Sequence, residues 1–119
     1  MRWFWQASER RRYPRFQTDL PVVASHIGER DIASFRTRCY SISEGGVGAA
    51  GFEPLTLGDF VTLELHLPVS AHPIWIDTIV RYSSTIRCGL EFRSLGANQR
   101  KLIKRYCRLQ PKEKSRRWI

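Results

Sequence analysis

The sequence predicts a mainly β protein, a six-stranded antiparallel barrel with a C-terminal α-helix. Between residues 21 and 93, short stretches rich in strand-forming residues alternate with turns that contain glycine, proline or aspartate. Beyond residue 96 the spacing of the apolar residues changes to that of a helix. A chain of 119 residues with 42% hydrophobic residues has the size of one domain and can bury a core without disulfide bonds.

Six segments carry the strand pattern. The clearest is residues 60–67, in which every second residue from Val61 onward is valine or leucine. In residues 74–83 the same alternation places Val80 and Tyr82 on one face. The predicted strands are residues 21–27, 34–43, 47–52, 60–67, 74–83 and 86–93. Short strands joined by turns favour a closed or nearly closed antiparallel barrel.

A helix is predicted over residues 97–110, because apolar residues recur there at helical spacing while basic residues cover the opposite face. Asn98 is expected to cap its N-terminus, and Pro111 is expected to end it. We predict three regions along the chain: an aromatic lead-in at residues 1–8, one domain at residues 9–110, and a basic tail at residues 111–119. The domain begins with a basic arm, residues 9–19.

The net charge of +9 favours an anionic partner such as a nucleotide, nucleic acid, anionic lipid or acidic protein, although a generally basic surface would carry the same charge. Cys39, Cys88 and Cys107 have neither disulfide nor zinc spacing, so we expect buried thiols in a reducing cytoplasm and no metal or cofactor. No apolar run approaches the roughly 20 residues that span a bilayer, and no transmembrane segment is expected. The start lacks the apolar region of a secretory signal.

Two short motifs are candidates for ligand binding. The arm carries Arg11 and Arg15, preceded by Arg10. An arginine fork matches guanine O6 and N7, stacks on a base and pairs with phosphate, although a generic polybasic arm has the same composition. Farther along, Ser41 and Ser43 point to the same side of a strand that ends at Gly45 and Gly46. Small hydroxyls beside a glycine turn can bond the Watson–Crick edge of guanine, but an ordinary polar turn looks similar.

In this order the motifs resemble the PilZ domain family, which carries an Arg-x-x-x-Arg arm followed by Asp/Asn-x-Ser-x-x-Gly on the barrel. The arm matches at Arg11 and Arg15, the second motif matches at Ser43 and Gly46, and Gly89–Phe92 is similar to the last strand of that family. The resemblance extends from about Glu9 to Leu109. It implies a cytoplasmic cyclic-di-GMP receptor whose ligand-binding residues are Arg10, Arg11, Arg15, Ser41, Ser43 and Gly46.

Ser41 departs from the pattern, because the family has Asp or Asn at this position. A neutral hydroxyl satisfies less of the guanine edge than a carboxylate does, and losing a charged hydrogen bond costs about 1.5–3 kcal/mol. Arg10 is an additional cation before the pair. In this family a basic residue there implies capture of an intercalated cyclic-di-GMP dimer rather than a single molecule.

Two other functions stay open. A basic barrel can bind RNA or single-stranded DNA, but no predicted strand carries a cluster of exposed aromatic residues for base stacking, which argues against nucleic acid. A PilZ-like domain can act as an interaction module without a ligand. An enzyme is not expected, because neither a nucleophile–base grouping nor a phosphate loop is found. The downstream protein partner is not specified by the sequence.

Overall fold

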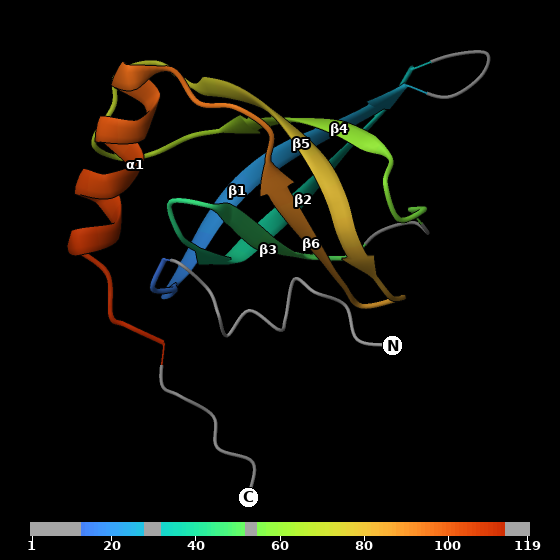
Figure 1. Ribbon diagram of the computed structural model, residues 1–119, viewed down its shortest axis with the longest axis horizontal. Coiled ribbons are helices and arrows are strands. Elements are labelled where there is room, and N and C mark those ends of the chain that lie inside the picture. The colour runs from blue at the N-terminus through green and yellow to red at the C-terminus, as the bar shows by residue number, and fades with distance from the viewer. Residues whose placement is uncertain (1–12, 28–31, 52–54, 114–119) are drawn as a thin grey trace, which may run out of the picture.

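The computed structural model describes residues 13–27, 32–51 and 55–113 (Figure 1). They form a closed barrel whose strands are ordered β1-β2-β3-β6-β5-β4, followed by one helix. Every strand pair is antiparallel. The elements are β1 (Phe16–Ile27), β2 (Ile32–Ile42), β3 (Gly46–Ala50), β4 (Phe60–Leu65), β5 (Ile74–Ser83), β6 (Arg87–Phe92) and α1 (Ala97–Arg108). The predicted fold is therefore confirmed.

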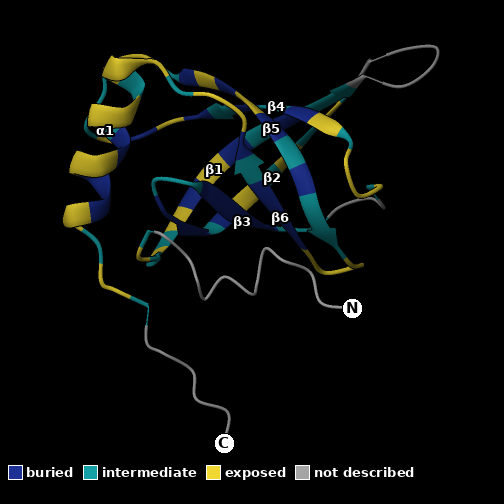
Figure 2. Ribbon diagram, in the orientation of Figure 1, coloured by how far each residue is buried: buried dark blue, intermediate teal, exposed yellow. Residues whose placement is uncertain are grey.

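The barrel closes where β1 pairs with β4, so that Val22 lies opposite Leu65. Closure leaves no unpaired sheet edge along the core. Alternate side chains of β4 fill the interior, as the sequence pattern predicts, and Leu63 and Leu65 are completely buried. Figure 2 colours the ribbon by burial, with buried residues recurring along the strands of the barrel. All three cysteines are buried free thiols, so their predicted burial is confirmed. Within the described ranges, no helix is long and apolar enough to cross a membrane.

The first strand begins earlier than predicted, at Phe16 rather than at residue 21. Phe16 pairs with Ile42 and Gln17 with Ser41, and the segment after the helix adds a bridge between Phe16 and Lys112. These partners are distant in sequence, and a local pattern does not reveal them. The last four residues of the predicted arm are thus strand, whereas residues 1–12 lie outside the described residues.

Asn98 is not the N-cap of α1; Gly96 takes that position. The Gln99 side chain accepts a hydrogen bond from the Gly96 amide at 3.0 Å, and its amide nitrogen donates to the Trp75 carbonyl oxygen at 3.0 Å. Gln99 therefore performs the stabilising role that the sequence assigned to Asn98, because it reaches both its own helix start and strand β5.

Tyr82 does not share the inward face of β5 with Val80. The pairing with β6 skips a residue between these two positions, since Val80 lies opposite Leu90 whereas Tyr82 lies opposite Gly89. A bulge of this kind reverses the side-chain alternation beyond it. Val80 remains in the core, and the Tyr82 hydroxyl meets the Tyr40 hydroxyl at 3.0 Å on the outer surface.

Helix α1 packs on the barrel through Ile103, Tyr106 and Cys107, which are all buried. The Tyr106 hydroxyl is hydrogen-bonded to the hydroxyl of Thr18 on β1. Past the helix, the Gln17 amide donates to the Pro111 carbonyl oxygen at 2.9 Å. The helix and the segment behind it are therefore attached directly to the first residues of β1.

We predict that the Thr18–Tyr106 hydrogen bond stabilises this attachment. Tyr106→Phe and Thr18→Val each remove one hydroxyl, and the double-mutant cycle should give a coupling energy of about 0.5–1.5 kcal/mol in urea unfolding. The double variant tests the pair directly, because it removes both groups. A coupling energy near zero would mean that the two hydroxyls do not stabilise one another.

Candidate functional site

The turn between β2 and β3 is held by three hydrogen bonds. The Ser43 amide donates to the Gly46 carbonyl oxygen at 2.9 Å, and the Gly45 amide donates to the Ser43 hydroxyl at 3.0 Å. The Phe92 amide donates to the Gly45 carbonyl oxygen at 2.9 Å. At Gly46 a Cβ atom would lie 2.3 Å from the Leu90 carbonyl oxygen. The turn therefore requires glycine at this position.

Ser41 lies near the end of β2 and Ser43 directly follows the strand. Cys39 and Ile42 are both in the core, and the pairing with β3 skips a residue between Cys39 and Ser41. This bulge turns Ser41 outward, although it is only 2% exposed and Ser43 only 6%. The Ser43 hydroxyl oxygen accepts from Gly45, so its proton remains able to donate to a ligand.

The described start of the chain lies against this turn. A Cβ atom on Gly45 would come within 3.0 Å of the Tyr13 ring, so the ring covers Gly45. Two residues later, the Arg15 carbonyl oxygen accepts from the Glu113 amide at 2.9 Å. The structure thus brings the end of the arm to the predicted serine–glycine turn. Arg10 and Arg11 lie outside the described residues.

An aromatic group beside Ser41 was not predicted as part of the site. Gly48 lies opposite Ser41 in the sheet, and the Tyr40 ring covers it so closely that a Cβ atom would meet the ring at 3.0 Å. The Arg87 guanidinium lies 5.2 Å from the centre of that ring. Burial and the hydrogen bond to Tyr82 raise the pKa of the Tyr40 hydroxyl above its usual range. The sequence offered one signal for this aromatic contact, which is a glycine inside each of two predicted strands. These glycines, Gly48 and Gly89, lie opposite each other in the sheet.

Two buried thiols lie near the turn and in helix α1. Burial raises the pKa of the Cys107 thiol on the helix to about 12, and the carboxylate of Glu44 in the turn acts in the same direction. Burial likewise raises the pKa of Cys39 to about 12. These thiols are protonated near neutral pH and are therefore poor nucleophiles and metal ligands. Over the part of the chain that the structure describes, no three acidic, histidine or cysteine side chains form a metal-binding group.

These features define a class of small closed β-barrel. In this class an arm covers a glycine turn and a helix packs against the barrel. The family model of the PilZ domain matches residues 9–109. The chain therefore belongs to the PilZ domain family. No curated protein matches the chain significantly.

Solved structures show the same fold. The inhibitor of motility MotI/DgrA of Bacillus subtilis is 26% identical, with a TM-score of 0.67 over 84% of this chain and 50% of its own. The PilZ domain with c-di-GMP of YcgR from Escherichia coli is 20% identical, with a TM-score of 0.67 over 85% of this chain and 91% of its own. The MrkH–c-di-GMP complex of K. pneumonia is 18% identical, with a TM-score of 0.61 over 81% of this chain. The chain spans about half the length of MotI/DgrA and MrkH.

We predict that Gly46→Ala destabilises the barrel by about 1–3 kcal/mol, because the new methyl group would force the backbones of β3 and β6 apart. Gly96→Ala is the matched control, since its Cβ would meet only the Gln99 side chain at 3.7 Å. Urea unfolding measures both variants. Equal stability of Gly46→Ala and the control would show that the strands have room for a side chain there.

Proposed function

We propose that this chain is a cyclic-di-GMP receptor. The observation that carries the proposal is the placement of the arm, because Tyr13 covers Gly45 within the turn that holds Ser43 and Gly46. Family membership and the c-di-GMP complexes of YcgR and MrkH support the same assignment. The ligand would bind between the arm and the outer surface of β2 and β3.

Each site residue has a proposed role that follows from its chemistry. Arg15, together with Arg10 and Arg11, would read guanine O6 and N7 or pair with the phosphates. Ser41 and Ser43 would bond the remaining polar edge of the base through their hydroxyls. Gly46 would act indirectly, because its lack of a side chain lets the turn that carries Ser43 lie against β6. Three arginines suit a ligand with several phosphates, so an intercalated dimer is the proposed stoichiometry.

Tyr40 is a further candidate for the wall of this site. Its ring lies on Gly48, directly across from Ser41, and Arg87 is positioned over the ring. A guanine base can stack on an aromatic or guanidinium plane, so this pair would provide such a surface next to the serines.

We propose that the domain, residues 9–110, acts as an adaptor and catalyses no reaction. Ligand binding would change the arm and present an altered surface to a protein partner in the cytoplasm. The hydrogen bond from the Glu113 amide to the Arg15 carbonyl oxygen supports this scheme, because it joins the backbone of the arm to the segment behind helix α1. A ligand that repositions Arg15 would therefore also act on that segment.

We predict that Arg15→Ala and Arg11→Ala each weaken cyclic-di-GMP binding by about 1–3 kcal/mol, because each removes a charged, geometrically specific contact. Isothermal titration at one salt concentration gives affinity and stoichiometry together. Arg36→Ala is the matched control, because Arg36 is exposed on β2 and its loss changes the net charge equally.

Two outcomes would refute the assignment. If Arg11→Ala and Arg15→Ala bind like Arg36→Ala, the arm does not read the ligand. If cyclic-di-AMP or random single-stranded RNA binds as tightly as cyclic-di-GMP, the site does not select guanine, since adenine presents a donor in place of O6. No binding of any of these would favour an interaction module without a ligand.

We predict that Ser41→Asp tightens cyclic-di-GMP binding about tenfold or more, because a carboxylate is a stronger acceptor for guanine N1–H and N2–H than a hydroxyl is. Ser94→Asp is the control, since it adds the same charge at an exposed position. Both are titrated beside the unmodified protein. Equal or weaker binding by a folded Ser41→Asp variant would place Ser41 away from the guanine edge.

A further inference from the structure

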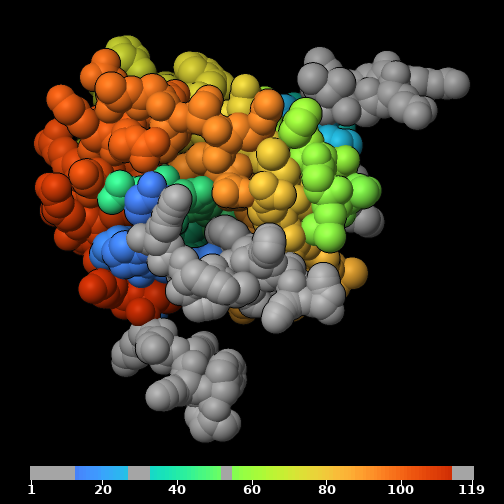
Figure 3. Space-filling view, viewed as in Figure 1, coloured from blue at the N-terminus to red at the C-terminus, as the bar shows by residue number. Residues whose placement is uncertain are grey.

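The positive charge of this protein is concentrated in its C-terminal part. Residues 1–92 contain ten basic and ten acidic residues, whereas residues 93–119 contain ten basic residues and one acidic residue, Glu113. The net charge of +9 therefore comes from residues 93–119. This region contains helix α1, which forms one side of the molecular surface (Figure 3).

Five cations of the helix lie exposed on the face opposite the barrel. They are Arg100, Lys101, Lys104, Arg105 and Arg108. Among the residues that the structure describes, none of the five forms an ion pair. Pairs such as Lys101–Arg105 and Lys104–Arg108 are four residues apart, so like charges repel along the helix, at about 0.2–0.5 kcal/mol per pair. The fold does not need this arrangement, because only the opposite face of the helix packs on the core.

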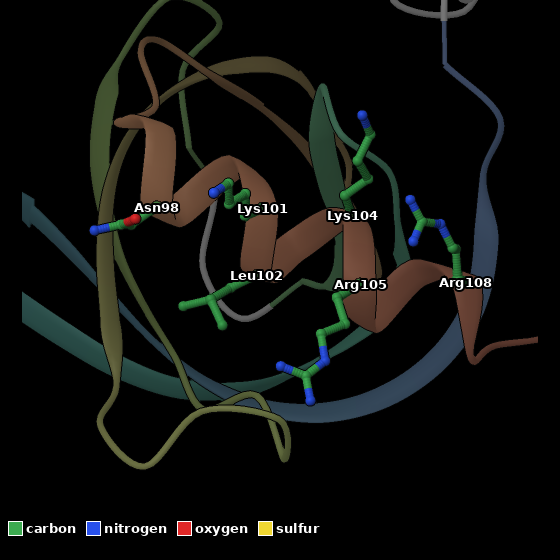
Figure 4. A pocket seen from close by; sticks show the side chains of 6 residues that line it. All are labelled: Asn98, Lys101, Leu102, Lys104, Arg105 and Arg108. Atoms are coloured by element: carbon green, nitrogen blue, oxygen red, sulfur yellow. The ribbon is translucent and has the colours of Figure 1, made fainter.

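The charged face is hollowed rather than smooth. Lys104 and Arg108 extend from one edge of the helix and Arg105 from the other, with Leu102 beside it (Figure 4). Four of the six residues that line this open hollow are cationic, and Leu102 is the single apolar one. A specific protein interface usually has an apolar, well-packed centre, which this face lacks. Its chemistry suits a polyanionic surface.

Exposed apolar side chains lie at both ends of the helix. At its start, Trp75 is 57% exposed, and its carbonyl oxygen is bonded to Gln99. At its end, Leu109 is 66% exposed. Tryptophan and leucine beside lysine and arginine are typical of surfaces that rest in the headgroup region of a bilayer. A nucleic acid backbone would pair with the cations but would offer no apolar region to these two side chains.

We propose that the outer face of helix α1 docks on an anionic phospholipid surface. Lys101, Arg105 and Arg108 would pair with lipid phosphates, and Leu109 and Trp75 would contact the acyl boundary. The helix would lie on the membrane and not insert, because its apolar face is already packed against the barrel. Binding would therefore be driven mainly by charge and weaken with salt. This inference does not depend on cyclic-di-GMP binding.

The test is sedimentation of the full chain with vesicles of equal parts phosphatidylglycerol and phosphatidylcholine, compared with pure phosphatidylcholine. The unmodified protein should bind the anionic vesicles and not the neutral ones. Lys101→Gln/Arg105→Gln/Arg108→Gln should weaken binding on the order of a hundredfold, since each basic residue near an anionic surface contributes about 1 kcal/mol. Circular dichroism checks that the variant is folded.

The control is Arg36→Gln/Arg38→Gln/Arg93→Gln, which removes the same charge from three exposed side chains outside the helix; of these, Arg38 is paired with Asp19 and Arg93 lies over the Phe60 ring. It should retain most of the vesicle affinity. Equal losses in the two triple variants would overturn the proposal, because binding would then follow net charge alone. Absence of binding to the anionic vesicles would also overturn it.

The last measurement separates lipid from nucleic acid. Leu109→Ser should weaken vesicle binding several-fold and leave the binding of a random DNA duplex unchanged, because only the bilayer offers an apolar phase. Should the unmodified protein bind the duplex more tightly than the vesicles at the same salt concentration, with Leu109→Ser equal to it in both assays, a nucleic acid would replace lipid as the partner of this face.

Discussion

The contact on which the site depends is the approach of two backbones, where Gly46 lies against the Leu90 carbonyl. It allows β3 and β6 to pair without separation and orients the turn so that the Phe92 amide can bond Gly45. With this bond in place, Gly45 presents an open surface to the Tyr13 ring. A side chain at Gly46 would therefore disturb both the closure of the barrel and the contact between Tyr13 and Gly45. The glycine is therefore a structural requirement of the barrel itself.

The arm is held between two parts of the protein. Tyr13 contacts the turn, while Arg15 and Gln17 share backbone hydrogen bonds with Glu113 and Pro111 behind the helix. The segment from residue 13 to residue 18 thus connects the serine–glycine turn to helix α1 through backbone bonds and the Thr18–Tyr106 pair. This continuity is the physical route by which a ligand on the arm would influence the helix. This connection is possible because β1 begins at Phe16, which forms a bridge with Lys112 behind the helix.

Most of the fold could be predicted, because each strand of this barrel carries its own local signal. Residues 74–83 were predicted with the observed bounds, and alternation in β4 identified the buried leucines. The errors share one cause, which is that bulges and long-range pairs are invisible in a local pattern. Tyr82 was placed inward because period two was assumed to continue through the bulge. Ser41 and Ser43 could be assigned to one side, but the position of Arg87 over the Tyr40 ring depends on the pairing of β2 with β3 and of β3 with β6.

The distribution of charge separates recognition at the turn from general attraction to anions. Residues 1–92 are balanced in charge, so the proposed contact of an arm arginine with the ligand would depend on geometry at contact distance, where a bidentate hydrogen bond is little screened by salt. The helix face carries several exposed cations, whose fields extend about a Debye length, roughly 8 Å at physiological ionic strength, and fade as salt rises. A nucleotide bound at the turn and a polyanion on the helix face therefore respond differently to ionic strength. The strong net charge does not identify the ligand of the arm, because the excess of basic residues lies in residues 93–119 of the sequence and not in the arm.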